Sequence, residues 1–155
     1  MLTRMLMIVV FAILFCNNLS YAAQKPDDRE AFAGLKRARV IFDVRVPDME
    51  KLVFNLNLIN ETFDGMLAQG IKPQMVIAFR GPGVKLLTLG VIDDEAHQLI
   101  RLLKKKGVRI EVCSVATRIF KVDNATIIPE VILVGNVFNS FIGYQNRGYA
   151  FIAIN

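Results

Sequence analysis

The feature that most constrains this chain is an alternation between short apolar runs, rich in β-branched residues, and longer segments whose apolar residues recur at helical spacing. Five of the apolar runs are expected to form strands: residues 38–46, 74–81, 108–113, 130–135 and 149–154. Strands that alternate with helices in this way are joined by crossover connections, which make the strands parallel and place helices on both faces of the sheet. We therefore predict a three-layer α/β/α sandwich with a mostly parallel sheet of about five strands.

The longest segment with helical spacing covers residues 48–70 and begins just after Pro47. Its apolar residues recur every three or four positions, which predicts one buried face. The predicted members of that face are Leu52, Leu56, Ile59, Phe63 and Leu67. Gly70 follows as a residue that tolerates the left-handed conformation found at helix ends.

A second helix is expected over residues 93–107, with acidic residues at its start and lysines at its end, where each charge suits the helix dipole. Its predicted buried face consists of Ala96, Leu99, Ile100 and Leu103. His97, the single histidine of the chain, should then point to solvent beside Arg101, so we do not expect it to pair with a catalytic cysteine. Shorter helices are expected over residues 84–90, 114–122 and 136–148.

The N-terminal segment has the features of a secretory leader. One cation, Arg4, precedes an apolar run over residues 5–15, and small residues follow. We predict a signal peptide over residues 1–22 that is cleaved after Ala22, with Ala23 as the alternative site. Because the leader looks bacterial, the mature protein is expected in the periplasm.

Two alternatives to cleavage are weaker. The apolar run of 11 residues is shorter than the roughly 20 that span a bilayer, which disfavours an uncleaved anchor. Bulky Phe15 disfavours a lipoprotein anchor on Cys16, because such signals carry a small residue there. We therefore expect no stable membrane insertion after cleavage, an N-terminal arm or linker over residues 23–37, and one domain over residues 38–155.

Charge and composition exclude several classes of function. The chain has 19 basic and 14 acidic residues, a formal charge of +5, and its cations are dispersed apart from residues 36–39 and 104–106. We interpret both clusters as solvated surface, since basic residues are not interleaved with aromatics as in nucleic-acid-binding proteins. One histidine and one cysteine far apart in the sequence do not make a ligand set, so neither a metal nor another cofactor is expected.

Cys113 is the cysteine that remains after signal cleavage, so an intramolecular disulfide is not possible. It ends an expected strand and precedes an expected helix, and the carboxyl ends of strands border the binding crevice in open α/β sheets. Backbone donors at the helix start, assisted by Arg118, would favour the nucleophilic thiolate. A cysteine that merely fills the core would have the same sequence, so packing is the competing interpretation.

Residues 80–85, RGPGVK, form a second candidate element at a strand end. A turn before a helix can present backbone donors to an anion. The motif lacks the glycine spacing of nucleotide-binding loops, and a structural turn is the alternative. The candidate binding residues are Gly81, Pro82 and Gly83, together with Ser114 at the start of the expected helix after Cys113.

Taken in order, several short motifs resemble the DsrE/DsrF-like family of small α/β proteins linked to sulfur oxidation and sulfur relay. The resemblance covers residues 38–154 and rests on the segments RVIFDV, NLNLIN, GPGVKLL, GVRIEVCSVATR and IIPEVILVGNVFNSFIGYQNRGYAFI. It implies a parallel-sheet fold and assembly into homo-oligomers, commonly dimers, trimers or hexamers.

The resemblance also implies a site. In sulfur-relay members a cysteine at the end of the third strand accepts sulfane sulfur as a persulfide, and by position that residue is Cys113. Arg118 matches an arginine that recurs five residues after the cysteine. Val115 and Ala116 depart from the Asn-Thr of the most similar subfamily, which removes two hydrogen-bonding side chains. The leader is a second departure, because the well-understood relay proteins work in the cytoplasm.

Our first hypothesis is an exported sulfur carrier, or sulfurtransferase-like protein, in which Cys113 takes sulfane sulfur as a persulfide and passes it to a partner thiol. Backbone donors of residues 81–83 and Ser114 would stabilise the anionic sulfur, with help from Arg118. The donor and acceptor are not identified by the sequence. The alternative is a non-catalytic oligomeric module that binds a small ligand or a partner, with Cys113 as packing. An intermolecular disulfide through Cys113 is a third possibility.

Overall fold

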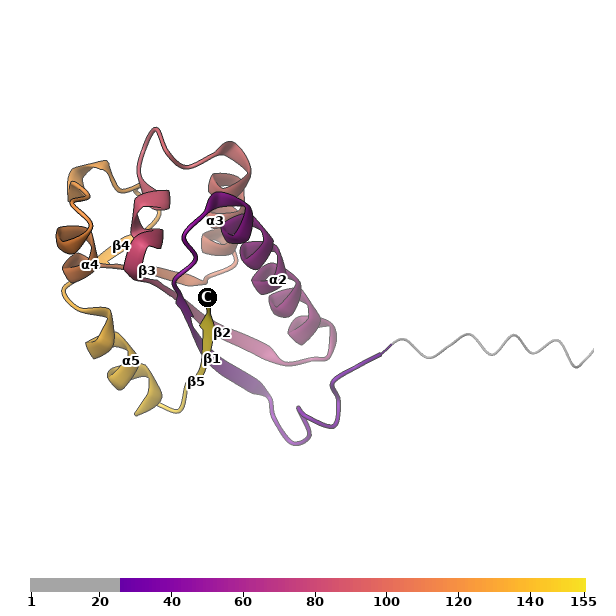
Figure 1. Ribbon diagram of the computed structural model, residues 1–155. Coiled ribbons are helices and arrows are strands. Elements are labelled where there is room, and N and C mark those ends of the chain that lie inside the picture. Colours follow the sequence, from indigo (N-terminus) through magenta and orange to yellow (C-terminus); the bar gives the residue numbers. More distant parts are fainter. Residues whose placement is uncertain (1–25) are drawn as a thin grey trace, which may run out of the picture.

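The computed structural model describes residues 26–155 (Figure 1). The predicted signal peptide lies outside the described residues. The elements in chain order are β1 (Arg37–Val44), α2 (Met49–Ala68), β2 (Lys72–Phe79), the 3-10 helix η1 (Gly81–Leu87), α3 (Asp94–Lys105), β3 (Arg109–Cys113), α4 (Ser114–Ile119), the 3-10 helix η2 (Asn124–Thr126), β4 (Ile132–Val134), α5 (Val137–Gln145) and β5 (Ala150–Ile154). The five strands form one sheet in the order β4-β3-β2-β1-β5.

Every strand pair in this sheet is parallel, which confirms the predicted α/β architecture. The chain steps from β1 through β2 and β3 to β4 in one direction, and then returns to place β5 on the other side of β1. Because crossover connections keep one hand, the reversal places its helix on the opposite face. Accordingly, α2 and α3 pack side by side on one face and α5 covers the other (Figure 1).

The face under α2 and α3 is an apolar core. The residues of β1 that point to it are Val40, Phe42 and Val44, and β2 adds Met75, Ile77 and Phe79. From α2, the buried residues are Leu52, Leu56, Ile59, Phe63 and Met66. The helix was predicted to bury Leu67 instead, but that side chain is 51% exposed. Positions 66 and 67 both lie at helical spacing from Phe63, so periodicity alone does not separate them.

The helix ends follow capping rules. Asp48 accepts a hydrogen bond from the amide of Lys51 at the start of α2, and Asp93 accepts one from the amide of Ala96 at the start of α3. After α2 and α3, Gly70 and Gly107 have φ values of 77° and 88°, in the left-handed region that favours glycine. These residues stop each helix so that the next strand can enter the sheet.

His97 does not point to solvent as predicted. Its side chain is 17% exposed, and its Nε2 lies 3.0 Å from Oε2 of Glu130. Arg101 donates from Nε to the other oxygen of the same carboxylate, at 2.9 Å. The segment before β4 therefore runs beside α3, a long-range contact that helical periodicity does not reveal. The histidine serves to join these two segments.

The described part of the predicted N-terminal arm, residues 26–36, forms a series of turns before β1. The amide of Asp28 donates to the side chain of Gln69 at 3.0 Å, and Phe32 is partly buried against the core. This segment thus lies against the C-terminal end of α2. Within residues 26–155, no helix combines the length and the apolar character needed to cross a membrane.

Candidate functional site

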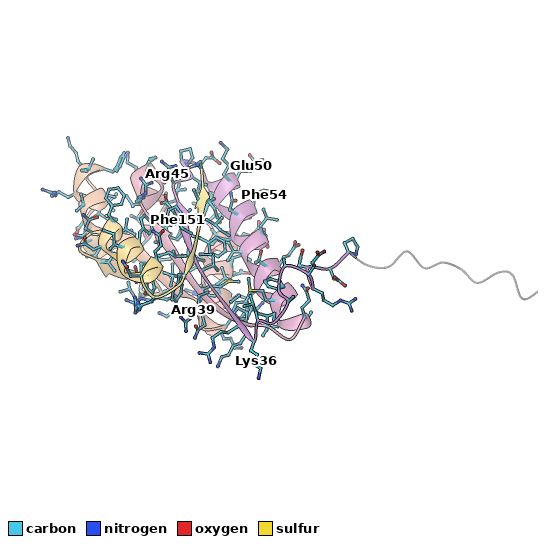
Figure 2. All side chains as sticks on the ribbon, turned by 90° about the horizontal axis from the view of Figure 1, so that it is seen from below. Lys36, Arg39, Arg45, Glu50, Phe54 and Phe151 are labelled. Carbon is cyan, nitrogen blue, oxygen red and sulfur yellow. The ribbon has the colours of Figure 1, made fainter. Side chains whose placement is uncertain are left out.

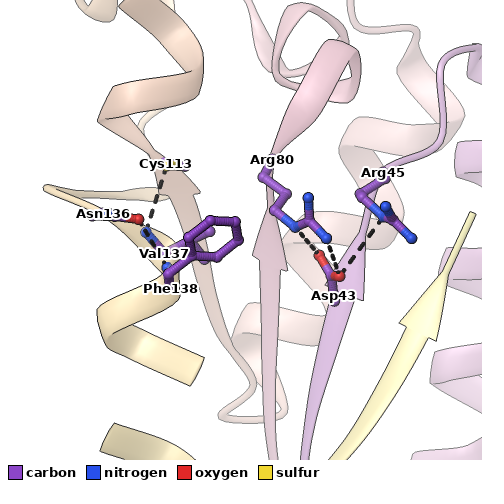
Figure 3. Close-up of polar contacts among 7 residues, drawn as sticks. All are labelled: Asp43, Arg45, Arg80, Cys113, Asn136, Val137 and Phe138. Carbon is purple, nitrogen blue, oxygen red and sulfur yellow. Dashed lines mark hydrogen bonds and ion pairs between the residues drawn. The ribbon is translucent and has the colours of Figure 1, made fainter. Parts of the chain in front are cut away.

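Cys113 is the last residue of β3 and the N-cap of α4. It is 4% exposed, and its Sγ accepts a hydrogen bond from the backbone amide of Val137 at 3.5 Å (Figure 3). Val137 is the first residue of α5, a helix capped by the side chain of Asn136. The amide that reaches the sulfur therefore comes from a helix 24 residues further along the chain.

A cavity of about 240 Å³ opens beside this sulfur, at the carboxyl ends of β2 and β3. This is the edge where parallel sheets place their binding crevices. Its walls come from the end of β2, from α4 and from the start of α5: Arg80, Gly81, Cys113, Val115, Ala116, Ile119, Phe120, Asn136, Val137 and Phe138. Most of these side chains are apolar, and Arg80 is the one charged residue among them.

Arg80 is held by a buried carboxylate (Figure 3). Its Nε donates to Oδ1 of Asp43 at 2.7 Å and its Nη2 donates to Oδ2 at 2.8 Å, which makes a bidentate pair. The Asp43 side chain is 2% exposed. Nε of Arg45 lies 3.7 Å from the same carboxylate and makes no hydrogen bond within residues 26–155. Two guanidiniums thus share one carboxylate, which leaves a net positive charge at this edge.

Strand register brings the arginine beside the cysteine. Phe79 of β2 pairs with Val112 of β3, so the next residues, Arg80 and Cys113, follow side by side at a spacing of about 4.8 Å between strands. Arg80 has an extended backbone, with φ −148° and ψ −179°, and therefore continues the alternation of the strand. Its guanidinium carbon lies 5.3 Å from the ring centre of Phe138, which Figure 3 shows between the guanidinium and Cys113.

The candidate residues predicted from sequence are not all brought together. Gly81 and Cys113 line the cavity, whereas Pro82, Gly83 and Ser114 are not part of its lining. Arg118 is exposed on α4 and is likewise absent from the lining. The proposed roles of these four residues remain predictions.

The backbone conformation and the packing of the turn explain why Gly81 and Gly83 are glycines. Gly81 has a φ of 64°, which an L side chain rarely adopts. A Cβ on Gly83 would lie 2.6 Å from the carbonyl oxygen of Val46, so the turn packs against the connection between β1 and α2. These requirements account for both glycines without a bound anion, in line with the structural alternative stated for this motif.

The sequence reasoning missed Arg80 and Asp43 as members of the site. A usable signal was present, because Asp43 lies inside an apolar strand and a buried carboxylate needs a cationic partner. The contribution of α5 had no comparable signal, since nothing in residues 136–138 indicates that they approach β3.

Chemically, the arrangement offers a thiol, one backbone donor to its sulfur, apolar walls and a fixed cation. A backbone donor and a nearby guanidinium both stabilise negative charge on sulfur or on a bound molecule. Among the residues described, no group of three or more histidine, cysteine, aspartate or glutamate side chains could hold a metal ion. A thiol that borders a cavity can act as a nucleophile toward a small molecule.

Comparison with known proteins identifies the family of this chain. The model of the DsrE/DsrF-like family matches residues 38–154 of the chain. No curated relative matches it.

Solved structures with the same fold include proteins from three different organisms. A protein of unknown function from Methanobacterium thermoautotrophicum is 20% identical, with a TM-score of 0.63 over 75% of this chain and 98% of its own. The ychN protein from E. coli is 12% identical, with a TM-score of 0.58 over 77% of this chain and 98% of its own. A conserved protein of unknown function from Bacteroides thetaiotaomicron is 19% identical, with a TM-score of 0.57 over 77% of this chain and 95% of its own. At these identities, the similarity establishes the fold.

Proposed function

This chain belongs to the DsrE/DsrF-like family, whose members are generally sulfur-relay proteins, and from that premise we propose that it is a sulfur carrier. Cys113 accepts sulfane sulfur as a persulfide and passes it to a partner thiol. The observation that carries the proposal is the position of the Cys113 sulfur, which borders a cavity and accepts a hydrogen bond from the Val137 amide. A buried thiol that served packing alone would need neither feature.

The transfer needs no external oxidant. The Cys113 thiolate attacks the outer sulfur of a persulfide R–S–SH, the S–S bond of the donor breaks, and its electron pair leaves with R–S⁻. The product is Cys113–S–SH. In the second step an acceptor thiolate attacks the outer sulfur, and the Cys113 thiolate leaves. The Val137 amide supports the proposal because it donates to the Cys113 sulfur and would stabilise its anionic form, and the Arg80 guanidinium adds a positive charge to the lining of the same cavity.

The direct test is the intact mass of the purified protein before and after incubation with inorganic polysulfide. We expect a gain of one or more sulfur atoms that a reducing thiol reverses. The matched control is Cys113→Ser, which changes one atom and should gain nothing. A wild-type protein that gains no sulfur, and whose cysteine reacts with iodoacetamide only after unfolding, would contradict the proposal.

That contradicting outcome would favour the second candidate, a binding module in which Cys113 is packing. The observation behind it is that Cys113 is 4% exposed and has apolar neighbours in Val115 and Ala116. A binding module predicts that Cys113→Ser keeps full function, with at most a modest loss of stability. The carrier predicts that the same variant keeps the fold and loses sulfur transfer.

We also propose that the protein forms a homo-oligomer through the β5 side of the sheet. Within the described chain β5 pairs with β1 alone, and Phe151 and Ile152, which point to opposite faces, are 41% and 47% exposed. Phe54 of α2 is 61% exposed, and both phenylalanines are labelled in Figure 2. Free strand edges with apolar side chains favour association with a second copy.

Light scattering after size exclusion tests this interface. The wild type should have the mass of a dimer or larger assembly, and Phe151→Asp should shift it to the mass of one chain. A monomeric wild type would contradict the proposal.

Export to the periplasm also remains a proposal. It rests on the leader at residues 1–22. N-terminal sequencing of the protein from a periplasmic fraction should find a chain that begins at Ala23. Full-length protein in the cytoplasmic fraction would contradict it.

A further inference from the structure

The guanidinium of Arg80 has hydrogen-bonding capacity that the fold does not use. Asp43 occupies Nε and one proton of Nη2. Nη1 makes no hydrogen bond to any residue in the described part of the chain, and Arg80 lines the cavity that holds Cys113. The free Nη1 and Nη2 protons form the second edge of the fork, which matches the two oxygens of a carboxylate.

This cation is fixed before any ligand arrives. The buried carboxylate of Asp43 holds the guanidinium through two bonds, so little side-chain entropy is left to lose on binding. Arg45 adds a second positive charge beside the same carboxylate, and its Nε is buried without a hydrogen bond inside residues 26–155. One carboxylate therefore does not neutralise the pair, and an incoming anion would complete the charge balance.

The size and lining of the cavity limit what can reach both Arg80 and Cys113. A volume of about 240 Å³ is below the range of roughly 300–1,000 Å³ that drug-sized ligands occupy. The side chains from α4 that line the cavity and the Phe138 ring are apolar, so they offer no acceptor that would compete with an anion for the guanidinium. A compact molecule with one anionic group near its sulfur fits these constraints.

We propose that Arg80 is the anion-binding residue of the Cys113 cavity and that the sulfur donor is a small persulfide that carries a carboxylate. The proposal rests on the proposed function and names its substrate class. Arg80 binds the carboxylate of the donor R–S–SH while the Cys113 thiolate attacks the outer sulfur, and R–S⁻ leaves with the electron pair of the broken S–S bond. Asp43 is a positioning residue, because it acts through Arg80.

The test compares two donors that differ in one group. Persulfides of 3-mercaptopropionate and of 3-mercaptopropionamide are generated in solution from the corresponding thiols, and loading of Cys113 is followed by intact mass. The rate with each donor is divided by the rate for the urea-unfolded protein, which removes the intrinsic reactivity of the donor. We expect the folded wild type to prefer the carboxylate donor by about tenfold, as one charge-assisted bidentate pair supplies.

Arg80→Gln should abolish this preference while loading from the amide donor continues, and Arg80→Lys should keep part of it. The matched control is Arg37→Gln, an exposed arginine at the start of β1, which should keep the full preference. If Arg80→Gln does not fold, competition on the wild type replaces it. Excess propionate should then slow loading from the carboxylate donor, and propionamide should not.

The outcomes separate the two proposals. Loading from neither donor would overturn the proposed function. Loading from both donors at equal normalised rates, or a preference that survives in Arg80→Gln, would overturn the role of Arg80 and leave the persulfide carrier intact. In the competition experiment, equal effects of propionate and propionamide would likewise overturn it.

Discussion

On the face of the sheet covered by α2 and α3, β1 presents Val40, Phe42 and Val44, and its neighbours add further apolar side chains. On the opposite face, β1 presents Asp43, and β3 presents Glu111 and Cys113. The first face is covered by helices of 20 and 12 residues, and the second by the nine residues of α5. The first face is therefore apolar at these positions, whereas the second combines buried apolar residues, Ile41, Val76 and Ala78, with paired polar groups.

Buried polar groups need partners at defined positions, whereas buried apolar side chains need only close contact. Glu111 accepts hydrogen bonds at Oε1 from Arg109 and from the Tyr144 hydroxyl, while its Oε2 is buried without a partner in residues 26–155. Asp43 depends in the same way on Arg80. A buried polar group that loses its partner retains the cost of its desolvation with nothing to offset it. Cys113 and Arg80 both lie on the α5 side, among the paired polar groups, and four predictions test how the two faces are held.

The largest effect is expected on the apolar face. Leu56 is 1% exposed and Leu67 on the same helix is 51% exposed. Leu56→Ala should lower the free energy of unfolding by roughly 2–5 kcal/mol, because it leaves a cavity in the core. Leu67→Ala should change it by less than about 1 kcal/mol. Urea denaturation followed by circular dichroism measures both, and equal losses would mean that α2 does not bury the face described.

The next effect tests the pairing on the other face. Asp43→Ala leaves the Arg80 guanidinium without its carboxylate and should cost roughly 2–4 kcal/mol of unfolding free energy. The double variant Asp43→Ala, Arg80→Met should recover part of this loss, since neither unpaired charge remains. A double-mutant cycle from urea denaturation gives the coupling. Strictly additive losses would show that the pair is not a unit.

A third prediction concerns the polar contact on the α3 side. Burial alone would raise the pKa of Glu130, but hydrogen bonds from His97 and Arg101 outweigh it and lower the pKa from 4.5 to about 2. A depressed pKa contributes stability above the unfolded value of 4.5, and this stability is lost as the pH falls toward 2.

Between pH 4.5 and 2, the wild type should therefore lose roughly 1–3 kcal/mol more than Glu130→Gln. Urea denaturation at several pH values within this interval measures the difference, and the other carboxylates cancel because both proteins contain them. Parallel curves for the two proteins would contradict the contact.

The smallest effect is expected for the hydroxyl that joins α5 to the sheet. Tyr144→Phe removes the donor to Glu111, a bond of 3.1 Å, and should cost roughly 1 kcal/mol of unfolding free energy.

Burial, with the nearby charge of Glu111, raises the pKa of Tyr144 above its usual 10.0. The contribution is therefore present below pH 10 and lost as the pH rises through the folded-state pKa. Urea denaturation at neutral and alkaline pH compares the variant with the wild type, whose advantage should shrink at the higher pH.

Local pattern was sufficient for much of the fold. The apolar runs predicted the strands, and Gly70 marked the end of α2, because both signals act between near neighbours in the chain. Long-range contacts could not be obtained in this way. His97 and Glu130 are separated by 33 positions, and helical periodicity assigned the histidine to solvent.

The same distinction between local signals and long-range contacts applies to the candidate site. Cys113 could be predicted because a strand end followed by a helix is visible in the sequence. The Val137 amide could not be, because its approach to the sulfur depends on how α5 crosses the sheet. Arg80 and Asp43 lie between these cases, since a carboxylate in an apolar strand predicts that a partner exists without identifying it.

The pairing of β5 with β1 has a consequence for the order in which the molecule is assembled. More than 100 positions separate the two strands, so one edge of β1 stays open during synthesis until residues 150–154 have emerged. The helix that supplies the amide to Cys113 lies just before that final strand. The residues of β1 to β3 are thus synthesised before α5, and Cys113 can gain its neighbours from α5 only after residues 137–145 have been made. Until α5 is in place, the Cys113 sulfur lacks the hydrogen bond from the Val137 amide.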